Sequence, residues 1–150
     1  MEAVSQSKSK EKSSFIILSL EEGRKVLNEQ CSREAPKGVT SYWVPSTEDV
    51  KKLERDFVKC VKGTLDLASY LRQYTGFKRG QKSFLYSNFE LKAGSEPSQK
   101  ATIACDGGNK FFGFIYNSST RTFSEFRFNG RSRGLDQMPG FSESATIQCK

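Results

Sequence analysis

The sequence predicts an α+β domain in which two N-terminal amphipathic helices pack on an antiparallel meander sheet of about five to six strands. Two observations carry this prediction. In the N-terminal part of the chain, apolar residues recur with helical spacing, whereas from Ala68 onward they alternate with polar residues. Turn signals separate the alternating runs, as is typical of consecutive antiparallel strands. We expect the helices to cover one face of the sheet.

The helices are predicted over about 20–30 and 46–61. Ser19-Leu20-Glu21-Glu22 matches a capping box, in which the serine side chain accepts an early amide and the glutamate reaches back to the start of the helix. The second helix keeps its apolar residues at i, i+3 and i+7. Trp43 lies in the connector before it and is expected to pack on its first turn. The short run 15–18 suits either a strand or the lead-in to the first helix.

The strands are predicted where apolar and polar residues alternate, between polar or glycine-containing turns. The predicted strands are 70–77, 83–89, 100–105, 110–116, 122–128 and 144–149. In the run 122–128, Phe126 and Phe128 share one face while Phe123 is out of phase, which predicts a β-bulge near Ser124.

Composition narrows the function classes. The chain has 150 residues, a net charge of +7, four cysteines and no histidine. Without histidine, serine–histidine and cysteine–histidine nucleophilic pairs and histidine-containing zinc sites are excluded. We therefore predict that the chain is not an enzyme, and we expect no catalytic residue, metal or cofactor. The excess positive charge favours an anionic partner without choosing among nucleic acid, lipid and acidic protein.

The chain is predicted to hold a disordered polar tail, 1–14, and a single domain, 15–150. The tail shows no signal-peptide pattern, and no apolar run reaches the ~20 residues that span a bilayer. The scattered cysteines form no C-x-x-C motif, so they suit either buried thiols or two disulfides.

Cys105-Asp106-Gly107-Gly108 has two interpretations. A thiol beside a carboxylate is a candidate nucleophile, but a neighbouring negative charge raises the pKa of a thiol and weakens it. Aspartate followed by glycine between two alternating runs is a strong hairpin signal. We therefore predict a turn over 106–109.

The aromatic runs around 110–128 also have two interpretations. Phenylalanines interleaved with Lys110, Arg121 and Arg127 resemble a platform on which single-stranded nucleic acid stacks. They equally suit the apolar face of a sheet under a helix, and we favour this second interpretation.

A polar cluster on the predicted hairpin 70–89 is the candidate binding site. Its side chains are expected on one exposed face of the sheet, where they suit recognition of a ligand or a protein. The proposed binding residues are Arg72, Tyr74, Tyr86 and Asn88, together with Arg127.

Five motifs occur together in this order: Gln30-Cys31-Ser32-Arg33, Trp43-Val44-Pro45-Ser46, Arg72-Gln73-Tyr74-Thr75-Gly76, Cys105-Asp106-Gly107-Gly108 and Phe128-Asn129-Gly130. Over about residues 28–130 the chain resembles a family of small bacterial proteins without assigned catalytic residues, many of which are exported to the periplasm. The resemblance implies an extracytoplasmic α+β domain. It also makes Cys31 and Cys105 the candidate disulfide pair, which an oxidising compartment would allow.

Together these observations predict a non-catalytic binding protein of the bacterial envelope, periplasmic or otherwise exported. It would act on a protein partner through a sheet face, as an inhibitor or immunity-type protein does. The alternative is a single-stranded nucleic-acid-binding module that uses the aromatic and basic residues. No membrane span is expected.

Overall fold

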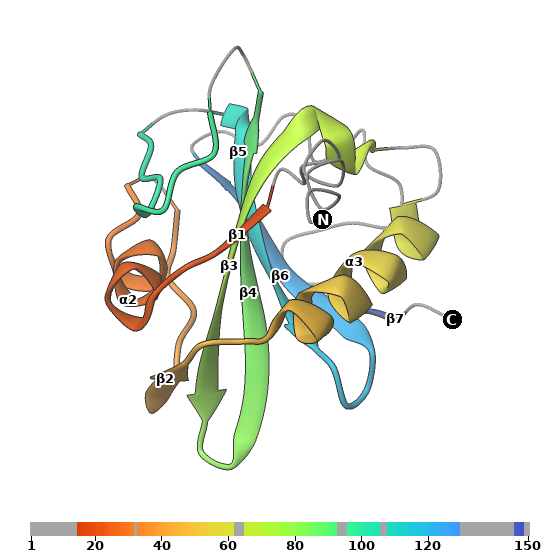
Figure 1. The fold of residues 1–150 in the computed structure, drawn as a ribbon. Helices are drawn as coiled ribbons and strands as arrows, with labels where there is room; N and C mark the ends of the chain where they lie inside the picture. The colour runs from red at the N-terminus through yellow and green to blue at the C-terminus, as the bar shows by residue number, and fades with distance from the viewer. Residues whose placement is uncertain are drawn as a thin grey trace, which may run out of the picture.

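The computed structural model describes residues 15–31, 33–61, 65–92, 96–105, 108–129 and 146–148. They form an α+β domain with a seven-stranded sheet and a helix on each side of it (Figure 1). The elements in chain order are β1 (Phe15–Ile17), α2 (Leu20–Asn28), β2 (Ser41–Trp43), α3 (Thr47–Val61), the 3₁₀ turn η1 (Leu67–Ser69), β3 (Tyr70–Arg79), β4 (Lys82–Leu91), β5 (Gly108–Asn117), β6 (Thr122–Asn129) and β7 (Thr146–Gln148).

The sheet is mostly antiparallel. β3, β4, β5 and β6 pair consecutively and antiparallel, which confirms the predicted meander for the long strands. β1 and β2 both pair with β3, at its N-terminal and C-terminal halves respectively. Because β1 runs parallel to β3, the sheet is mixed and not purely antiparallel as predicted. β7 pairs with the start of β6 at the opposite edge.

Each helix begins at a serine whose side chain accepts an early amide. At α2, Ser19 Oγ accepts from the amide of Glu22 at 3.2 Å. The Glu22 carboxylate does not close the predicted capping box, because it accepts from the amide of Ala101 at 2.8 Å. At α3 the box is reciprocal: the Asp49 amide donates to Ser46 Oγ, and the Ser46 amide donates to Asp49 Oδ2.

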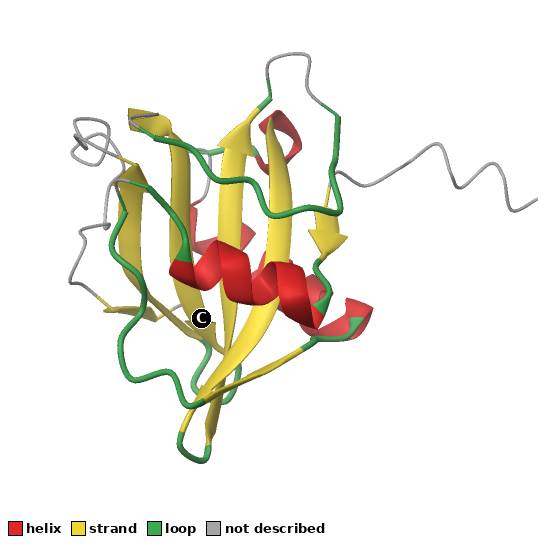
Figure 2. Cartoon of the chain, turned by 90° about the vertical axis from the view of Figure 1, so that its left-hand side faces the viewer, coloured by secondary structure: helices red, strands yellow, loops and turns green. Residues whose placement is uncertain are grey.

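The two helices cover opposite faces of the sheet, and the expectation that they share one face is wrong. Val50, Leu53 and Phe57 of α3 pack on one face. Val26 and Leu27 of α2 pack on the other. Figure 1 shows the sheet between α2 and α3, and Figure 2 looks onto the α2 side with the long strands behind the helix. Both sheet faces therefore contribute to a buried apolar core.

The aromatic residues of β4, β5 and β6 form the core under α3. Phe57 lies at the centre, stacked on Phe114 with ring centroids 4.7 Å apart. It also makes edge contacts with Phe89 and Phe123. Such clusters contribute apolar burial and favourable ring–ring geometry. The prediction that these phenylalanines are core is confirmed.

Several local predictions are settled by the strand register. The predicted β-bulge is present: the pairing slips between Gly113 and Ile115, opposite Glu125, which has a φ of 52°. Residues 15–17 form a strand. The segment 100–105 was predicted as a strand but pairs with none, and the predicted connector contains β2. Of the predicted turn 106–109, Asp106 and Gly107 lie outside the described residues, as does the tail 1–14.

Candidate binding surface

The predicted cluster on β3 and β4 is divided between the two sheet faces. Gln73 pairs with Asn88 across the hairpin. Cross-strand partners share a face and neighbours along a strand alternate, so Arg72 and Tyr74 face α3 while Tyr86 and Asn88 face α2. All four predicted binding side chains are buried. The expectation that they form one exposed face is wrong, because the helices cover both faces.

Arg72 and Tyr74 hold α3 on the sheet. Arg72 Nε and the Tyr74 hydroxyl both donate to Glu54 Oε2, at 2.9 and 2.7 Å. Arg72 Nη1 also donates to the Leu67 carbonyl, which fixes the 3₁₀ turn beside the helix. Burial, together with the negative charge of Glu54, raises the pKa of Tyr74 well above its usual value. These polar groups are committed to internal bonds.

A second anchor holds α3 near its middle. The buried Asp56 carboxylate accepts from Arg121 Nε at 3.0 Å and from Arg121 Nη2 at 2.5 Å. The Tyr116 hydroxyl donates to the same carboxylate. The bonds from Arg121 lower the pKa of Asp56 below its usual value, although burial opposes them. Glu54 and Asp56 are thus each bonded to an arginine and a tyrosine, with Arg72 and Tyr74 on β3, Tyr116 on β5 and Arg121 in the turn before β6.

On the α2 face, Tyr86 belongs to a buried network centred on Arg33. Arg33 Nε donates to Asn129 Oδ1 at 2.7 Å, and Arg33 Nη1 donates to the Tyr86 hydroxyl at 2.8 Å. Asn129 Nδ2 donates in turn to the Ala104 carbonyl at 2.7 Å. Gly113 leaves the room that this network needs, because a β-carbon there would lie 2.6 Å from Arg33 Nη1.

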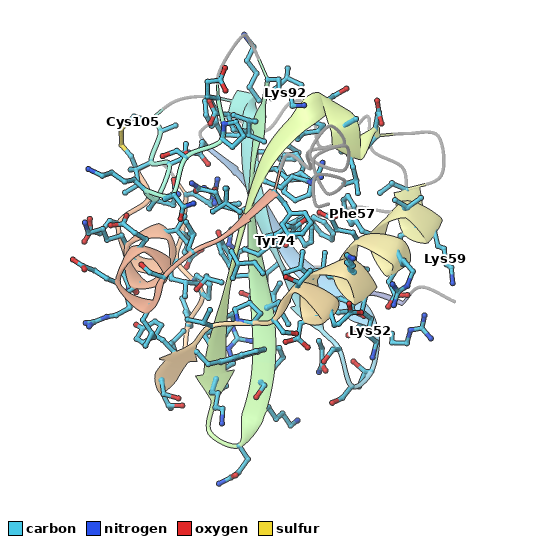
Figure 3. The ribbon with its side chains drawn as sticks, in the orientation of Figure 1. Lys52, Phe57, Lys59, Tyr74, Lys92 and Cys105 are labelled. Atoms are coloured by element: carbon cyan, nitrogen blue, oxygen red, sulfur yellow. A yellow bond between two sulfur atoms is a disulfide. The ribbon has the colours of Figure 1, made fainter. Side chains whose placement is uncertain are left out.

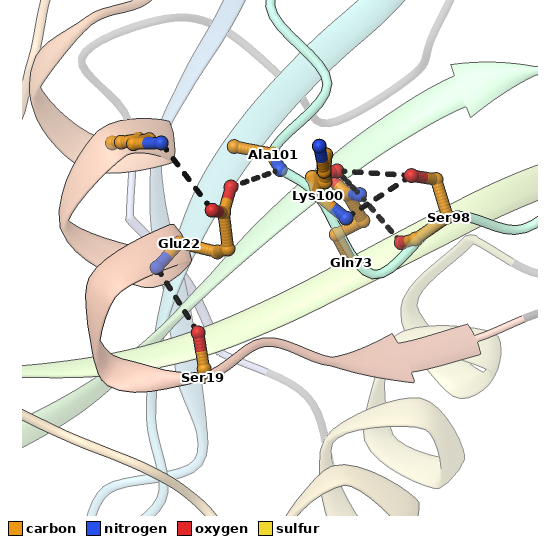
Figure 4. Close-up of polar contacts among 7 residues, drawn as sticks. Ser19, Glu22, Gln73, Ser98, Lys100 and Ala101 are labelled. Atoms are coloured by element: carbon orange, nitrogen blue, oxygen red, sulfur yellow. Dashed lines mark hydrogen bonds and ion pairs between the residues drawn. The ribbon is translucent and has the colours of Figure 1, made fainter.

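Asn88 holds the segment 96–105 against the sheet with the help of Gln73. Gln73 Nε2 donates to the carbonyls of Ser98 and Lys100 at 3.1 and 2.6 Å. Asn88 Nδ2 donates to the Thr102 carbonyl at 3.1 Å. Figure 4 shows Glu22 and Gln73 binding this segment from the helix and the sheet. These amides replace the missing strand pairing of the segment.

The predicted disulfide between Cys31 and Cys105 is confirmed, with an S–S distance of 2.06 Å. It joins Cys31, in the loop after α2, to the end of the segment 96–105, and the sulfur of Cys105 lies at the periphery in Figure 3. Cys60 is also disulfide-bonded, so the alternative of a buried free thiol is wrong for it. Because Cys105 is oxidised, it offers no thiol nucleophile beside Asp106.

Arg127 lies on the α2 side, where its guanidinium approaches Glu34 at 3.8 Å and Glu125 at 3.9 Å. It shares this face with Tyr86 and Asn88, because it pairs with Gly113 and Gly113 pairs with Asn88, but Arg72 and Tyr74 lie on the other face. Within the described ranges, no cluster of acidic and cysteine side chains is arranged to hold a metal ion. Neither helix there is long and apolar enough to cross a membrane.

The outward side of α3 carries a groove that the sequence analysis did not single out. It has a volume of about 370 Å³ and is lined by Lys51, Glu54, Arg55, Val58 and Leu67. Figure 3 shows Phe57 directed from α3 toward the sheet and Lys59 directed away from it. The available signal was the repeat of basic residues at positions 51, 55 and 59, which falls on one side of a helix.

The groove combines an apolar patch with positive charge. Val58 is 49% exposed and lines the groove together with Leu67, so the two aliphatic residues form an apolar surface beside the cations. Lys51, Arg55 and Lys59 form no ion pair with any described residue. Lys52 differs from them, because its Nζ donates to the Ser118 carbonyl at 3.1 Å.

No family model, no curated protein and no solved structure matches this chain significantly.

Proposed function

We propose that the protein is a non-catalytic binding protein of the bacterial envelope, of the inhibitor or immunity type, that holds a protein partner. The observation that carries this proposal is the contrast between the two sides of α3. Glu54, at the edge of the groove, and the buried Asp56 are neutralised by bonds from Arg72, Tyr74 and Arg121. On the outward side, Lys51, Arg55, Lys59 and the exposed Val58 line or flank a groove, and these three cations form no ion pair with a described residue.

The contact surface is the outward side of α3 and not a sheet face. A sheet face would have to lose a helix to become accessible, and with it the burial of residues such as Phe57 and Leu27. A groove on a helix surface needs no such rearrangement. Preformed apolar grooves flanked by charges are typical of protein–protein contacts.

The disulfides support an exported location. Structural disulfides form and persist in oxidising compartments and are rare in the bacterial cytosol. The described cysteines Cys31, Cys60 and Cys105 are all disulfide-bonded.

Single-stranded nucleic-acid binding has less support. Binding of this kind relies on exposed aromatic rings on which bases stack. Here Phe112, Phe114, Phe126 and Phe128 are buried under α3. None of the exposed large apolar side chains within the described ranges is aromatic.

Site-specific photo-crosslinking tests the proposal. We would place a photoreactive benzoylphenylalanine at Val58, export the full chain into the envelope of its source organism, and identify adducts by mass spectrometry. A single protein adduct at Val58, in defined stoichiometry on purification, is expected. The matched control carries the same group at Glu21, on the exposed side of α2, and should give no such adduct. Equal adducts at both positions, or none at Val58, would refute the proposal.

A further inference from the structure

We infer that the groove along α3 recognises an acidic segment of the partner protein that inserts at least one apolar side chain against Val58 and Leu67. The inference rests on the proposed function and names the chemistry of its partner. It depends on the arrangement of charge along α3, on the apolar surface between the charges, and on the finding that the exposed large apolar residues of the described ranges are all aliphatic.

The charge arrangement is unfavourable to the isolated chain. Lys51, Arg55 and Lys59 follow one another at i, i+4 spacing, so each lies one helical turn from the next. Like charges at this spacing repel and destabilise a helix. Glu54 beside the row accepts from Arg72 and Tyr74 through Oε2, and Asp56, which attracts Lys59, is bonded to Arg121. A partner that supplies negative charge would relieve the repulsion along this row.

One acidic residue, Glu48, precedes the row by a single turn, and Asp49 beside it is bonded to the Ser46 amide. Both lie in the first turn of α3, where negative charge also interacts with the helix dipole. The C-terminal two thirds of the outward side, from Lys51 to Lys59, is therefore the positive part. An acidic segment is expected to lie along that part and not at the start of the helix.

The aliphatic surface of the groove favours an acidic peptide over nucleic acid as the anionic partner. Val58 is exposed beside the cations, and Leu67 of the 3₁₀ turn also lines the groove. Aliphatic side chains bury well against other aliphatic side chains, whereas nucleic-acid bases need aromatic partners. The occupant that fits both the charge and the surface is a protein segment in which carboxylates flank a leucine, isoleucine or valine.

Titration by nuclear magnetic resonance tests this inference without a known partner. The probe is a synthetic peptide in which pairs of glutamates alternate with leucines, and the amide resonances of the labelled full chain report where it binds. We expect shifts at Lys51, Arg55, Val58 and Leu67, weakened by added salt because exposed charges are screened. A peptide with glutamine in place of glutamate, and one with alanine in place of leucine, should each bind more weakly.

Charge reversal supplies the matched variants. The α3 variant carries three substitutions together, Lys51→Glu, Arg55→Glu and Lys59→Glu. Its affinity for the peptide should be lower by about ten-fold or more, because attraction becomes repulsion. The control reverses Lys82, Lys92 and Lys110, three exposed cations outside α3, and changes the net charge by the same amount. Circular dichroism confirms that both variants are folded. Equal weakening in both, shifts located elsewhere, or tighter binding of a thymidine oligonucleotide than of the peptide would overturn the inference.

The two proposals fail in different ways. If the Val58 adduct forms and its yield is unchanged by the α3 charge reversal, the protein partner stands and the acidic segment is wrong. If the peptide binds as expected but no adduct forms at Val58, the groove has the stated chemistry and the envelope partner is wrong.

Discussion

Arg33 Nε donates to Asn129 Oδ1 at 2.7 Å, and this bond joins the loop after α2 to the last residue of β6. The guanidinium is buried, and its bonds to described residues go to neutral groups. A buried charge of this kind depends strongly on every bond that it makes.

Asn129→Ala should therefore destabilise the protein by about 2–3 kcal/mol, because it leaves a buried guanidinium nitrogen without its acceptor. Urea unfolding measures the loss. Asn28→Ala is the matched control: it removes a hydrogen bond to the Tyr42 hydroxyl at an exposed position. That change should cost less than about 0.5 kcal/mol. Equal costs would mean that the Arg33 network contributes little.

The lowered pKa of Asp56 predicts that the folded protein loses stability in acid. Its pKa in the folded protein is lowered from the usual 3.8, first by its bonds to Arg121. The stabilisation is thus complete at neutral pH, and it is lost as the pH falls below about 3.8 and through the lower folded pKa. Urea unfolding as a function of pH follows it.

Asp56→Asn should remove the acid-dependent part of the stability and lower the free energy of unfolding at pH 7 by about 2 kcal/mol. This cost is smaller than that of breaking a fully buried ion pair, because the side chain of Arg121 is 47% exposed. Glu48→Gln removes the same charge from the exposed side of α3 and should keep the wild-type pH dependence. An Asp56→Asn variant as acid-sensitive as the wild type would contradict the role of this anchor.

The Cys31–Cys105 disulfide closes a long loop, because its two cysteines are 74 positions apart in sequence. Replacing both cysteines with serine should lower the free energy of unfolding by about 2–4 kcal/mol. In the wild type, alkylation before reduction should label none of Cys31, Cys60 and Cys105. Labelling of Cys31 or Cys105 in protein isolated from the envelope would contradict the disulfide.

The close contact between Gly76 and Trp43 predicts that substitutions at the two positions have non-additive effects on the free energy of unfolding. A β-carbon at Gly76 would lie 2.6 Å from Trp43 Cδ2, because the indole packs flat on this glycine while its Nε1 donates to the Phe77 carbonyl. Gly76→Ala should cost about 1–3 kcal/mol through overpacking. In a Trp43→Ala background the same change should cost less, because the indole contact is gone, but not nothing, because the added β-carbon still lies 2.8 Å from the carbonyl oxygen of residue 43. Additive costs in the double-mutant cycle would show that the two residues do not interact in this way.

The turn predicted over 106–109 stays a prediction. Asp106→Asn keeps the turn chemistry, because asparagine also bonds to local amides. It should leave both the melting temperature and partner binding nearly unchanged. Loss of binding or activity in a variant that melts normally would instead indicate a functional carboxylate at this position.

Local sequence patterns determined the elements of this protein. Apolar residues at i, i+3 and i+7 specified α3 because one face of a helix must be buried, and alternation specified β3 to β6 for the corresponding reason in strands. The β-bulge opposite Gly113 was visible as a break in that alternation. The Cys31–Cys105 pair followed from the resemblance and not from the residues alone.

Tertiary structure decided which faces these elements present. Both faces of β3 and β4 are buried, so their composition does not tell which helix covers which face. The two-residue turn that pairs Arg79 with Lys82 places even-numbered residues of β3 beside odd-numbered residues of β4. Tyr74 and Tyr86 consequently lie on opposite faces, although both stand at even-numbered positions in alternating apolar and polar runs. The groove likewise exists only because η1 packs beside α3. Neither segment's own sequence indicates that the two are in contact.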